Sequence, residues 1–454
     1  MPGLFGIFEV GRRTVLAYQS AMNAVGHNVA NASTPGYHRQ RVELRATAPL
    51  IDAFGALGTG VRAAGVQRVE NRFLEYAVQR EIPTMGRYEA RADALAQTEL
   101  MFGEPSENGL TKSLDEFFGA WDDLASTPED AGARESVVRI GASLADSIRS
   151  TRERLWDQRT AVNTEIQGTV DDANRVAREL HRLNRSILQT GASGEIAPDL
   201  EDRRDQLVES LADLVGGIAE VDHNGTATVW VSGRVIVQAE TIQEITFDLS
   251  ESEYPMTGDR AIPADRLEGR LGGLIQVRDD DLEGAIRRLD EFAARLVRDV
   301  NGLHQRGVDS NGKPGGAFFE IDALGNDGVS RAAAGIRVSQ ALLDDSRRLA
   351  AGTTGKPGDN AIALDVAALR NDPHGFVGML EAMIVDVGGR AREAQDLRLG
   401  QGIVLDSFRA QRESVSGVSL DEEAADLMRF QRAFQAGAQI LATADEMTQT
   451  ILSL

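Results

Sequence analysis

Large apolar residues recur at seven-residue intervals at both ends of the chain, and a second series follows three positions later. This heptad pattern is typical of a helix that packs along another helix. It predicts one helix over residues 4–30 and another within residues 416–454. We call the repeating positions the terminal seams: Phe8, Val15, Tyr18, Met22, Val25 and Val29 near the N-terminus, and Leu420, Leu427, Phe430, Phe434, Leu441 and Ile451 near the C-terminus. Both ends therefore carry helices that need long partners, which favours a role in assembly over a self-contained helical domain.

Helical periodicity continues through most of the interior. Apolar residues spaced three and four apart predict helices over approximately 68–102, 111–127, 128–191, 199–215, 266–305 and 376–415. The third of these, with roughly 60 residues, would be ~90 Å long at 1.5 Å per residue. Such a length is typical of a fibrous or coiled-coil element. The predicted fold class is therefore mainly α, with a bundle or rod of long helices.

One interior segment changes from a helical period to an alternating one. Residues 226–231 and 234–237 alternate as strands do, and an Asn-Gly pair and a Ser-Gly pair supply the turns. We therefore expect a small β insertion at about 221–250.

Two domains follow from this order of elements. Residues 1–66 and 410–454 are expected to form a terminal coiled-coil domain from the two end helices. Residues 67–409 are expected to form the helical rod domain, with short mixed elements at about 307–372.

Charge and composition argue against several classes of function. The net charge of −22 argues against nucleic-acid binding, which needs a basic surface to displace counterions from phosphates. No apolar run reaches the ~18 residues of a membrane span, and no cleavable secretory signal is recognisable. The ends differ in sign: residues 1–45 hold five arginines against two acids, and residues 416–454 hold two arginines against six acids. Opposite charge on the two seamed ends favours their pairing.

The residues that carry chemistry form no catalytic pattern. Asp309, Asn311 and Gly312 resemble the start of a calcium loop, but prolines and glycines break its register. Gly355-Lys356 resembles a phosphate loop in which Pro357 replaces the required Ser or Thr. The acidic run 279–281 is expected to lie on a solvated helix face. We therefore predict no catalytic residue, no cofactor and no metal site, and expect a structural protein and no enzyme.

A motif after the first predicted helix suggests a family. The stretch Asn28-Val-Ala-Asn-Ala-Ser-Thr-Pro-Gly-Tyr-His-Arg-Gln40 resembles the motif of the flagellar axial proteins, which form the rod, the hook and the hook-associated structures. Its defining residues are Asn28, Asn31, Pro35, Gly36 and Tyr37. The stretches 202–207, 269–280, 300–304, 315–319 and 416–447 are similar to hook-associated members in particular. The resemblance covers nearly the whole chain in the same order.

The resemblance implies a structural adapter that joins the flagellar hook to the filament. In this family the terminal helices form an inner tube and are disordered in the free monomer, so the terminal seams would be the assembly interface. The implied partners are further copies of the chain in a ring, hook protein, the next hook-associated protein, an export chaperone and the type III export apparatus, with no nucleic acid and no membrane. The implied location is the extracellular flagellum, after a transient cytoplasmic stage.

One alternative stays open, namely another axial component such as hook protein. Hook protein is mainly β outside its terminal helices, and the long helices expected here argue against it. The segment 317–372 is also short for the outer domain of many relatives.

Overall fold

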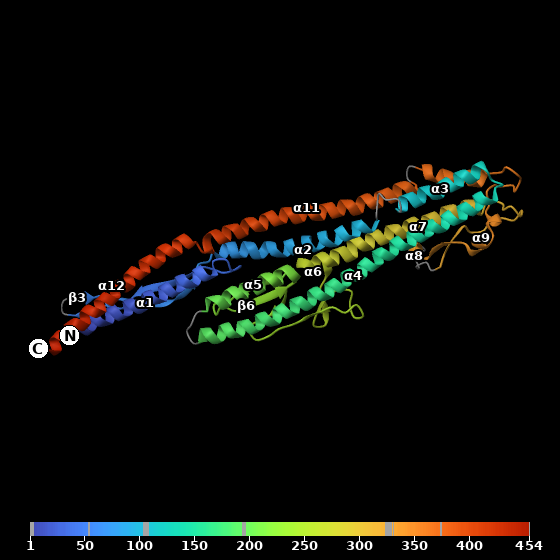
Figure 1. The fold of residues 1–454 in the computed structure, drawn as a ribbon. Helices are drawn as coiled ribbons and strands as arrows, with labels where there is room; N and C mark the ends of the chain where they lie inside the picture. Colours follow the sequence, from blue (N-terminus) through green and yellow to red (C-terminus); the bar gives the residue numbers. More distant parts are fainter. Residues whose placement is uncertain are drawn as a thin grey trace. The chain divides into compact units, whose positions relative to one another are not determined.

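The mainly helical fold is confirmed in the computed structural model (Figure 1), which describes residues 4–52, 55–102, 109–192, 197–322, 329, 331–372 and 375–453. The α-helices are α1 (Leu4–Asn31), α2 (Arg72–Phe102), α3 (Leu110–Ser126), α4 (Ala131–Ala192), α5 (Pro198–Val215), α6 (Gly269–Gln276), α7 (Glu283–His304), α8 (Ala332–Gly335), α9 (Gln340–Asp344), α10 (Ala361–Ala368), α11 (Phe376–Ser416) and α12 (Leu420–Leu452). A π-helical turn, Val277–Leu282, joins α6 to α7. The helices expected near both termini and through the interior are therefore present.

Short antiparallel strands complete the fold. They are β1 (Gln40–Ala46), β2 (Leu50–Asp52), β3 (Gly55–Leu57), β4 (Val61–Arg68), β5 (Ile218–Val221), β6 (Ala227–Val231), β7 (Arg234–Val237), β8 (Ile245–Thr246), β9 (Met256–Thr257), β10 (Arg260–Ala261), β11 (Phe319–Ile321) and β12 (Ile336–Val338). The predicted β insertion is β5–β6–β7, with β8 close behind it in sequence. The pairing of β1 with β4 was not predicted, because a bulge at Glu43/Leu44 interrupts the alternation.

The chain forms two compact units. Unit 1 contains residues 1–86, 169–269 and 400–454, and unit 2 contains residues 87–168 and 270–399. Three of the divisions fall inside α2, α4 and α11. This grouping differs from the expected domains, whose boundaries lay at 66/67 and 409/410. Within unit 1, hydrogen bonds to Asp202 from His38, just before β1, and from Arg68 of β4 join the N-terminal segment to α5.

Unit 1 has its core where α4 and α5 pack on the small sheet. Two buried asparagines of α4 each form a pair of hydrogen bonds with a backbone segment. Asn184 donates to Ala227 O at 2.8 Å and accepts from Ala227 N at 3.0 Å, and Asn174 does the same with Ile245. These side chains satisfy strand groups that would otherwise be buried without partners.

Unit 2 is built around an aromatic cluster and a buried ion pair. Phe117 and Trp121 of α3 contact the Phe318 ring, with ring centroids 5.7 and 5.5 Å away. Asp281, in the π-helical turn, accepts hydrogen bonds from Arg91 at 3.0 Å and Arg390 at 2.8 Å. The expectation that residues 279–281 lie on a solvated helix face is therefore wrong for Asp281, which is buried. Of the three, Asp280 is exposed and Asp279 is half-buried.

Candidate functional site

The two terminal helices, α1 and α12, lie side by side in unit 1 (Figure 1), and small residues line their contact. A Cβ atom on Gly11 would lie 2.9 Å from Leu441 Cγ, and one on Gly437 would lie 2.8 Å from Thr14 Cγ2. Each glycine therefore makes room for a branched side chain of the other helix. Ala17, Ala21 and Ala444 are also buried. The absence of larger side chains lets the helix backbones approach closely, and this contact defines the terminal helix pair.

The residues of the terminal seams are only partly buried within the single chain. Of the N-terminal seam, Val25 is buried and Val15, Tyr18 and Met22 are half-buried, whereas Phe8 and Val29 are exposed. Of the C-terminal seam, Leu427, Phe430, Phe434 and Leu441 are half-buried, whereas Leu420 and Ile451 are exposed. The rings of Tyr18 and Phe430 lie 5.9 Å apart, which joins one residue of each seam. The role of the seams in assembly between subunits stays a prediction.

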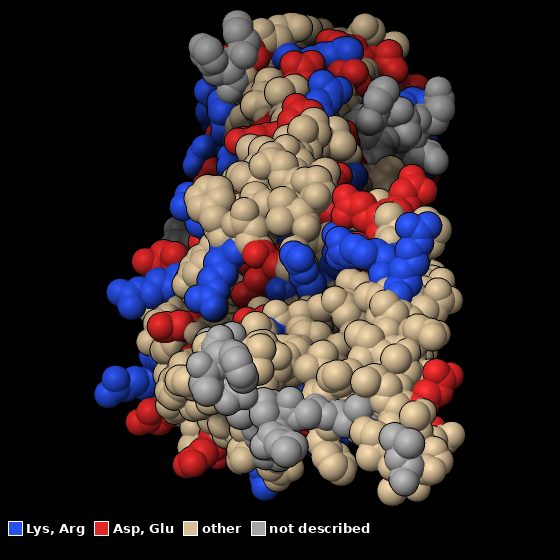
Figure 2. All heavy atoms as spheres, turned by 90° about the vertical axis from the view of Figure 1, so that its left-hand side faces the viewer, with Lys and Arg blue, Asp and Glu red and all other residues tan. Residues whose placement is uncertain are grey.

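Further large apolar side chains of the terminal helix pair face solvent. They are Phe5, Ile7 and Leu16 on α1, and Met428, Ile440, Met447 and Leu452 on α12. Figure 2 shows the side on which the two termini lie, with broad areas that carry neither acidic nor basic side chains. These exposed positions were not predicted, because the heptad pattern assigned the large residues to the contact. The alanines at 17, 21 and 24, spaced three or four apart, were the signal that small residues form it.

The family motif fixes the base of this pair through Asn28. The Asn28 side chain is buried and uses all of its hydrogen-bonding groups. Its Nδ2 donates to Gln40 O at 2.9 Å and to Glu423 Oε2 at 3.0 Å. Its Oδ1 accepts from Gln40 N and from Tyr37 Oη, both at 2.8 Å. One side chain of α1 thus joins the start of β1 to the first turn of α12.

The other motif residues shape the turn between α1 and β1. Asn31 Nδ2 donates to His27 O at 3.0 Å, which satisfies a carbonyl in the last turn of α1. Gly36 has φ of +72°, a conformation that favours glycine, and Gln206 of α5 donates to Pro35 O at 2.9 Å. The turn is therefore held against α5.

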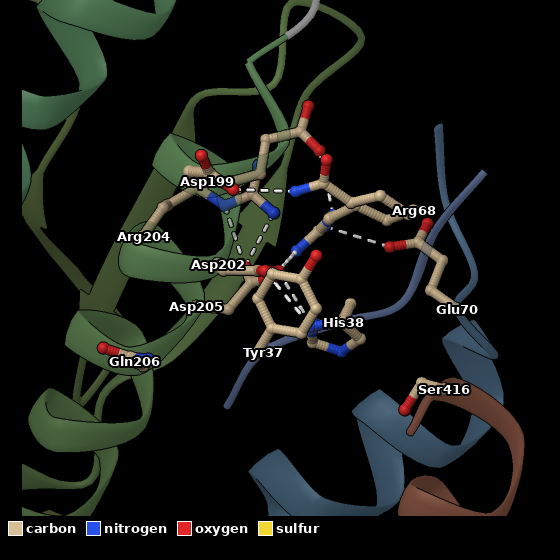
Figure 3. A network of polar contacts seen from close by, with 12 residues as sticks. Tyr37, His38, Arg68, Glu70, Asp199, Asp202, Arg204, Asp205, Gln206 and Ser416 are labelled. Carbon is tan, nitrogen blue, oxygen red and sulfur yellow. Dashed lines mark hydrogen bonds and ion pairs between the residues drawn. The ribbon is translucent and has the colours of Figure 1, made fainter. Parts of the chain in front are cut away.

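A charged network, which we call the anchoring network, follows the motif (Figure 3). His38 Nδ1 lies 2.8 Å from Asp202 Oδ1, and His38 Nε2 lies 3.1 Å from Glu75 Oε1. Arg68 Nη1 donates to both Asp202 and Asp205 at 2.7 Å. The network joins β1 and β4 to α2 and α5. Sequence reasoning did not single out His38 or Arg68, although 202–207 was among the stretches similar to hook-associated proteins.

A second set of ion pairs joins the motif to α12. Arg39 donates to Glu423 and Glu422, both at 2.6 Å. Glu422 and Glu423 occupy the first turn of α12, where negative charge is favourable. Arg412 of α11 donates to Glu209 of α5 at 2.5 Å and to Glu75 of α2 at 3.2 Å. These ion pairs join the motif to α12, and join α11 to α5 and α2.

The anchoring network keeps His38 charged. Burial by itself would lower the His38 pKa, but hydrogen bonds to Asp202 and Glu75 outweigh it and raise the pKa to about 9. Burial likewise opposes ionisation of Asp202 and Glu75, and the hydrogen bonds from His38 hold both of their pKa values below the ordinary range. An imidazolium with a carboxylate on each ring nitrogen is the result.

We expect unit 1 to lose stability between pH 6.5 and pH 9.5. The raised His38 pKa contributes about 3 kcal/mol that is fully present below the ordinary value of 6.5 and lost as the pH rises through 9. Nuclear magnetic resonance should show the His38 ring titrating near pH 9. The His304 ring, whose pKa is lowered by burial, serves as the internal control. A His38 midpoint near 6.5 would contradict this assignment, and His38→Gln should remove the alkaline loss in urea unfolding.

Among the described residues no group of carboxylates and histidines could hold a metal ion. None of the described helices is long and apolar enough to span a membrane. The site is therefore a pair of terminal helices with exposed apolar side chains. The anchoring network attaches the base of this pair to α2 and α5.

Comparisons with known proteins agree with this organisation. Residues 95–319 match the model of the "Flagellar hook-associated protein FlgK helical domain", and residues 409–454 match the "Flagellar basal body rod FlgEFG protein C-terminal". Flagellar hook-associated protein 1 of Bacillus subtilis is 28% identical over 100% of this chain and 99% of its own length. The Escherichia coli protein of the same name is 25% identical over 96% of this chain and 97% of its own length.

A solved structure shares the fold. The flagellar hook junction protein FlgK from Burkholderia pseudomallei aligns with a TM-score of 0.65 at 16% identity, covering 76% of this chain and 100% of that chain. The helical-domain match at 95–319 also removes the support for hook protein as the alternative. With full-length relatives of one name, the matched helical domain and the shared fold, the chain belongs to the family of flagellar hook-associated protein 1, structural components of the flagellum.

Proposed function

We propose that this chain is the structural adapter between the flagellar hook and the filament, and that it assembles as a ring through its terminal helix pair. The observation that carries the proposal is the set of uncovered apolar side chains on both α1 and α12. Contiguous apolar surface on a single chain marks an interaction site, because water disfavours it. The names of the full-length relatives, "Flagellar hook-associated protein 1", support a location in the flagellum.

The proposed partners follow from this role. Copies of the chain cover the exposed residues of the terminal seams, hook protein lies on one side of the ring, and the next hook-associated protein lies on the other. Before assembly the same surface needs protection, which an export chaperone on α12 provides until the type III export apparatus takes the chain to the cell exterior. We further expect α1 and α12 to be poorly ordered in the isolated chain, since only part of each helix is covered within one molecule.

Removal of the gene tests this function. We expect cells with hooks of normal length, no filaments, and unpolymerised filament subunits in the medium, and we expect a plasmid copy to restore filaments. Electron microscopy of the cell surface and detection of filament protein in the medium are the measurements. Missing hooks would indicate hook protein instead, and cells that keep their filaments would refute the adapter function.

A further inference from the structure

Two turn segments in unit 2 share one tetrapeptide sequence and have no role in the terminal helix pair. The tetrapeptide Gly-Lys-Pro-Gly occurs at 312–315 and again at 355–358. The chain has 48 basic residues, of which only three are lysines, Lys112, Lys313 and Lys356. Two of the three therefore lie in these twin turns. The same segments resembled calcium and phosphate loops in sequence without completing either motif.

The fold brings the twin turns together. Val308 N donates to Gly352 O at 2.8 Å, and a Cβ atom on Gly355 would lie 3.1 Å from Val308 Cγ1. Ser310 N donates to Arg347 O at 3.1 Å, which adds the neighbouring turn at 346–348. In Figure 1 these loops lie at the end of unit 2 that also carries α9 and α3.

The buried His304 side chain forms hydrogen bonds with both segments of this loop cluster. Its Nδ1 donates to Gly316 O at 2.8 Å, and its Nε2 accepts from Ala350 N at 2.9 Å. Burial lowers the His304 pKa, so the ring stays neutral and keeps one donor and one acceptor. One buried ring thus ties the segment after the first turn to the segment before the second, which makes the cluster a defined surface.

The nearby carboxylates Asp309 and Asp359 form no ion pair with the lysines in the described part of the chain. Asp309 Oδ1 accepts from Asn311 N and Lys313 N, both at 2.8 Å. Asp359 Oδ2 accepts from Thr353 N at 2.9 Å and from Thr354 N at 2.6 Å. Both acids therefore bind backbone groups. Lys313, Arg348 and Lys356 are exposed and form no ion pair with any residue that the structure describes; we call these three the basic turn surface.

Unit 2 also carries an acidic surface that lacks partners. Asp122 and Asp123 in the last turns of α3, with Glu129 just after it, are exposed and form no ion pair within the described part of the chain. We call these residues the acidic end of α3. Asn360 Nδ2 donates to Ala125 O at 2.6 Å, which fixes this end of α3 to the segment behind the second turn. Unit 2 therefore presents two surfaces of opposite charge.

We propose that in the assembled ring the basic turn surface of one copy binds the acidic end of α3 of the next copy. This inference rests on the proposed function. Contact between two different surfaces of the same chain propagates from copy to copy into a ring or helical array. Contact of the basic surface with itself would place like charges opposite each other. In a chain of net charge −22, opposite surfaces also decide where one copy can approach the next, and they fix the register.

Cysteine cross-linking tests the contact directly, because the chain has no cysteine of its own. Lys356→Cys is combined with Asp122→Cys, flagella are isolated and oxidised, and the chain is detected after non-reducing electrophoresis. We expect a ladder of covalent multimers from the double variant, and monomers from each single variant and from the dilute unassembled double variant. Detection of the unchanged chain in isolated flagella separates the two proposals: its absence would refute the adapter function, whereas a double-cysteine variant that is present in flagella but forms no multimers counts against this contact alone.

Charge exchange provides a second readout that does not depend on disulfide geometry. Lys313→Glu with Lys356→Glu should reduce the fraction of cells with filaments roughly tenfold, as should Asp122→Lys with Asp123→Lys. The quadruple variant should recover most of the loss, and Lys112→Glu, which reverses the charge of the remaining lysine of the chain, should leave the fraction unchanged. A double-cysteine variant that stays monomeric, together with a quadruple variant no better than its parents, would overturn the proposal.

Discussion

Replacing Leu441 with aspartate is expected to abolish incorporation of the chain into flagella while unit 2 stays folded. Leu441 Cγ lies 2.9 Å from the position that a Cβ on Gly11 would take, so the side chain occupies the closest part of the terminal helix pair. A carboxylate at this half-buried position would be partly desolvated without a partner, at a cost on the order of 2 kcal/mol. It would also stand four residues before Asp445, and like charges at this spacing repel on a helix.

The control for this prediction keeps the volume and changes the shape. Leu441→Met should assemble nearly as well as the unchanged chain, because methionine can fill the same space. Gly11→Leu should fail like Leu441→Asp for a steric reason, since its side chain would meet Leu441 and Ile440. Swimming in soft agar and electron microscopy measure the result. Motile cells with filaments from Leu441→Asp would show that this contact is not required for assembly.

Replacing Asp281 with alanine is expected to destabilise unit 2 by about 3–5 kcal/mol, because it leaves a buried arginine without its carboxylate. Arg91, itself buried, has both of its hydrogen bonds to Asp281 at 3.0 and 3.1 Å. Arg390 also loses its hydrogen bond to Asp281 Oδ1. It is partly exposed, however, and keeps its hydrogen bond to Asp386 Oδ2 at 2.9 Å. The larger part of the loss therefore comes from Arg91.

Asp280→Ala is the matched control, since the adjacent aspartate is exposed and its removal should change the free energy of unfolding by less than about 0.5 kcal/mol. Urea unfolding followed by the fluorescence of Trp121 and Trp156, which both lie in unit 2, measures the difference. Equal midpoints for the two variants would mean that the Asp281–Arg91 pair contributes nothing to the stability of unit 2.

The sequence predicted helices better than it predicted contacts. The helix expected at 128–191 is present as α4, with 62 residues, because its apolar stripe repeats without interruption. The strand β4 was missed because its sequence, VRAAGVQR, lacks the alternation and the large residues that strands usually show. The burial of Asp281 was missed because a π-helical turn changes which side of the helix the acidic run faces.

The sequence predicted several residues of the candidate site, but it did not predict most of the contacts between them. The motif residues Asn28 and Tyr37 were named from the resemblance, but nothing in their spacing showed that one asparagine would bond β1 and α12 together. His38 and Asp202, which form the centre of the anchoring network, are 164 positions apart in the chain. In the structure a Cβ atom on Gly11 or Gly437 would lie within 3 Å of a side chain of the other terminal helix, a clearance that the heptad spacing did not reveal.

The sequence by itself determined the mainly helical fold, the extent of the long helices and the presence of seamed helices at both ends. It could do so because a helix buries a stripe that repeats every few residues, so the evidence for it is local. Only the tertiary structure decided which faces of α1 and α12 meet, and which polar groups find each other at their base. Those contacts join residues that are hundreds of positions apart, and their partners exist only once the chain has folded.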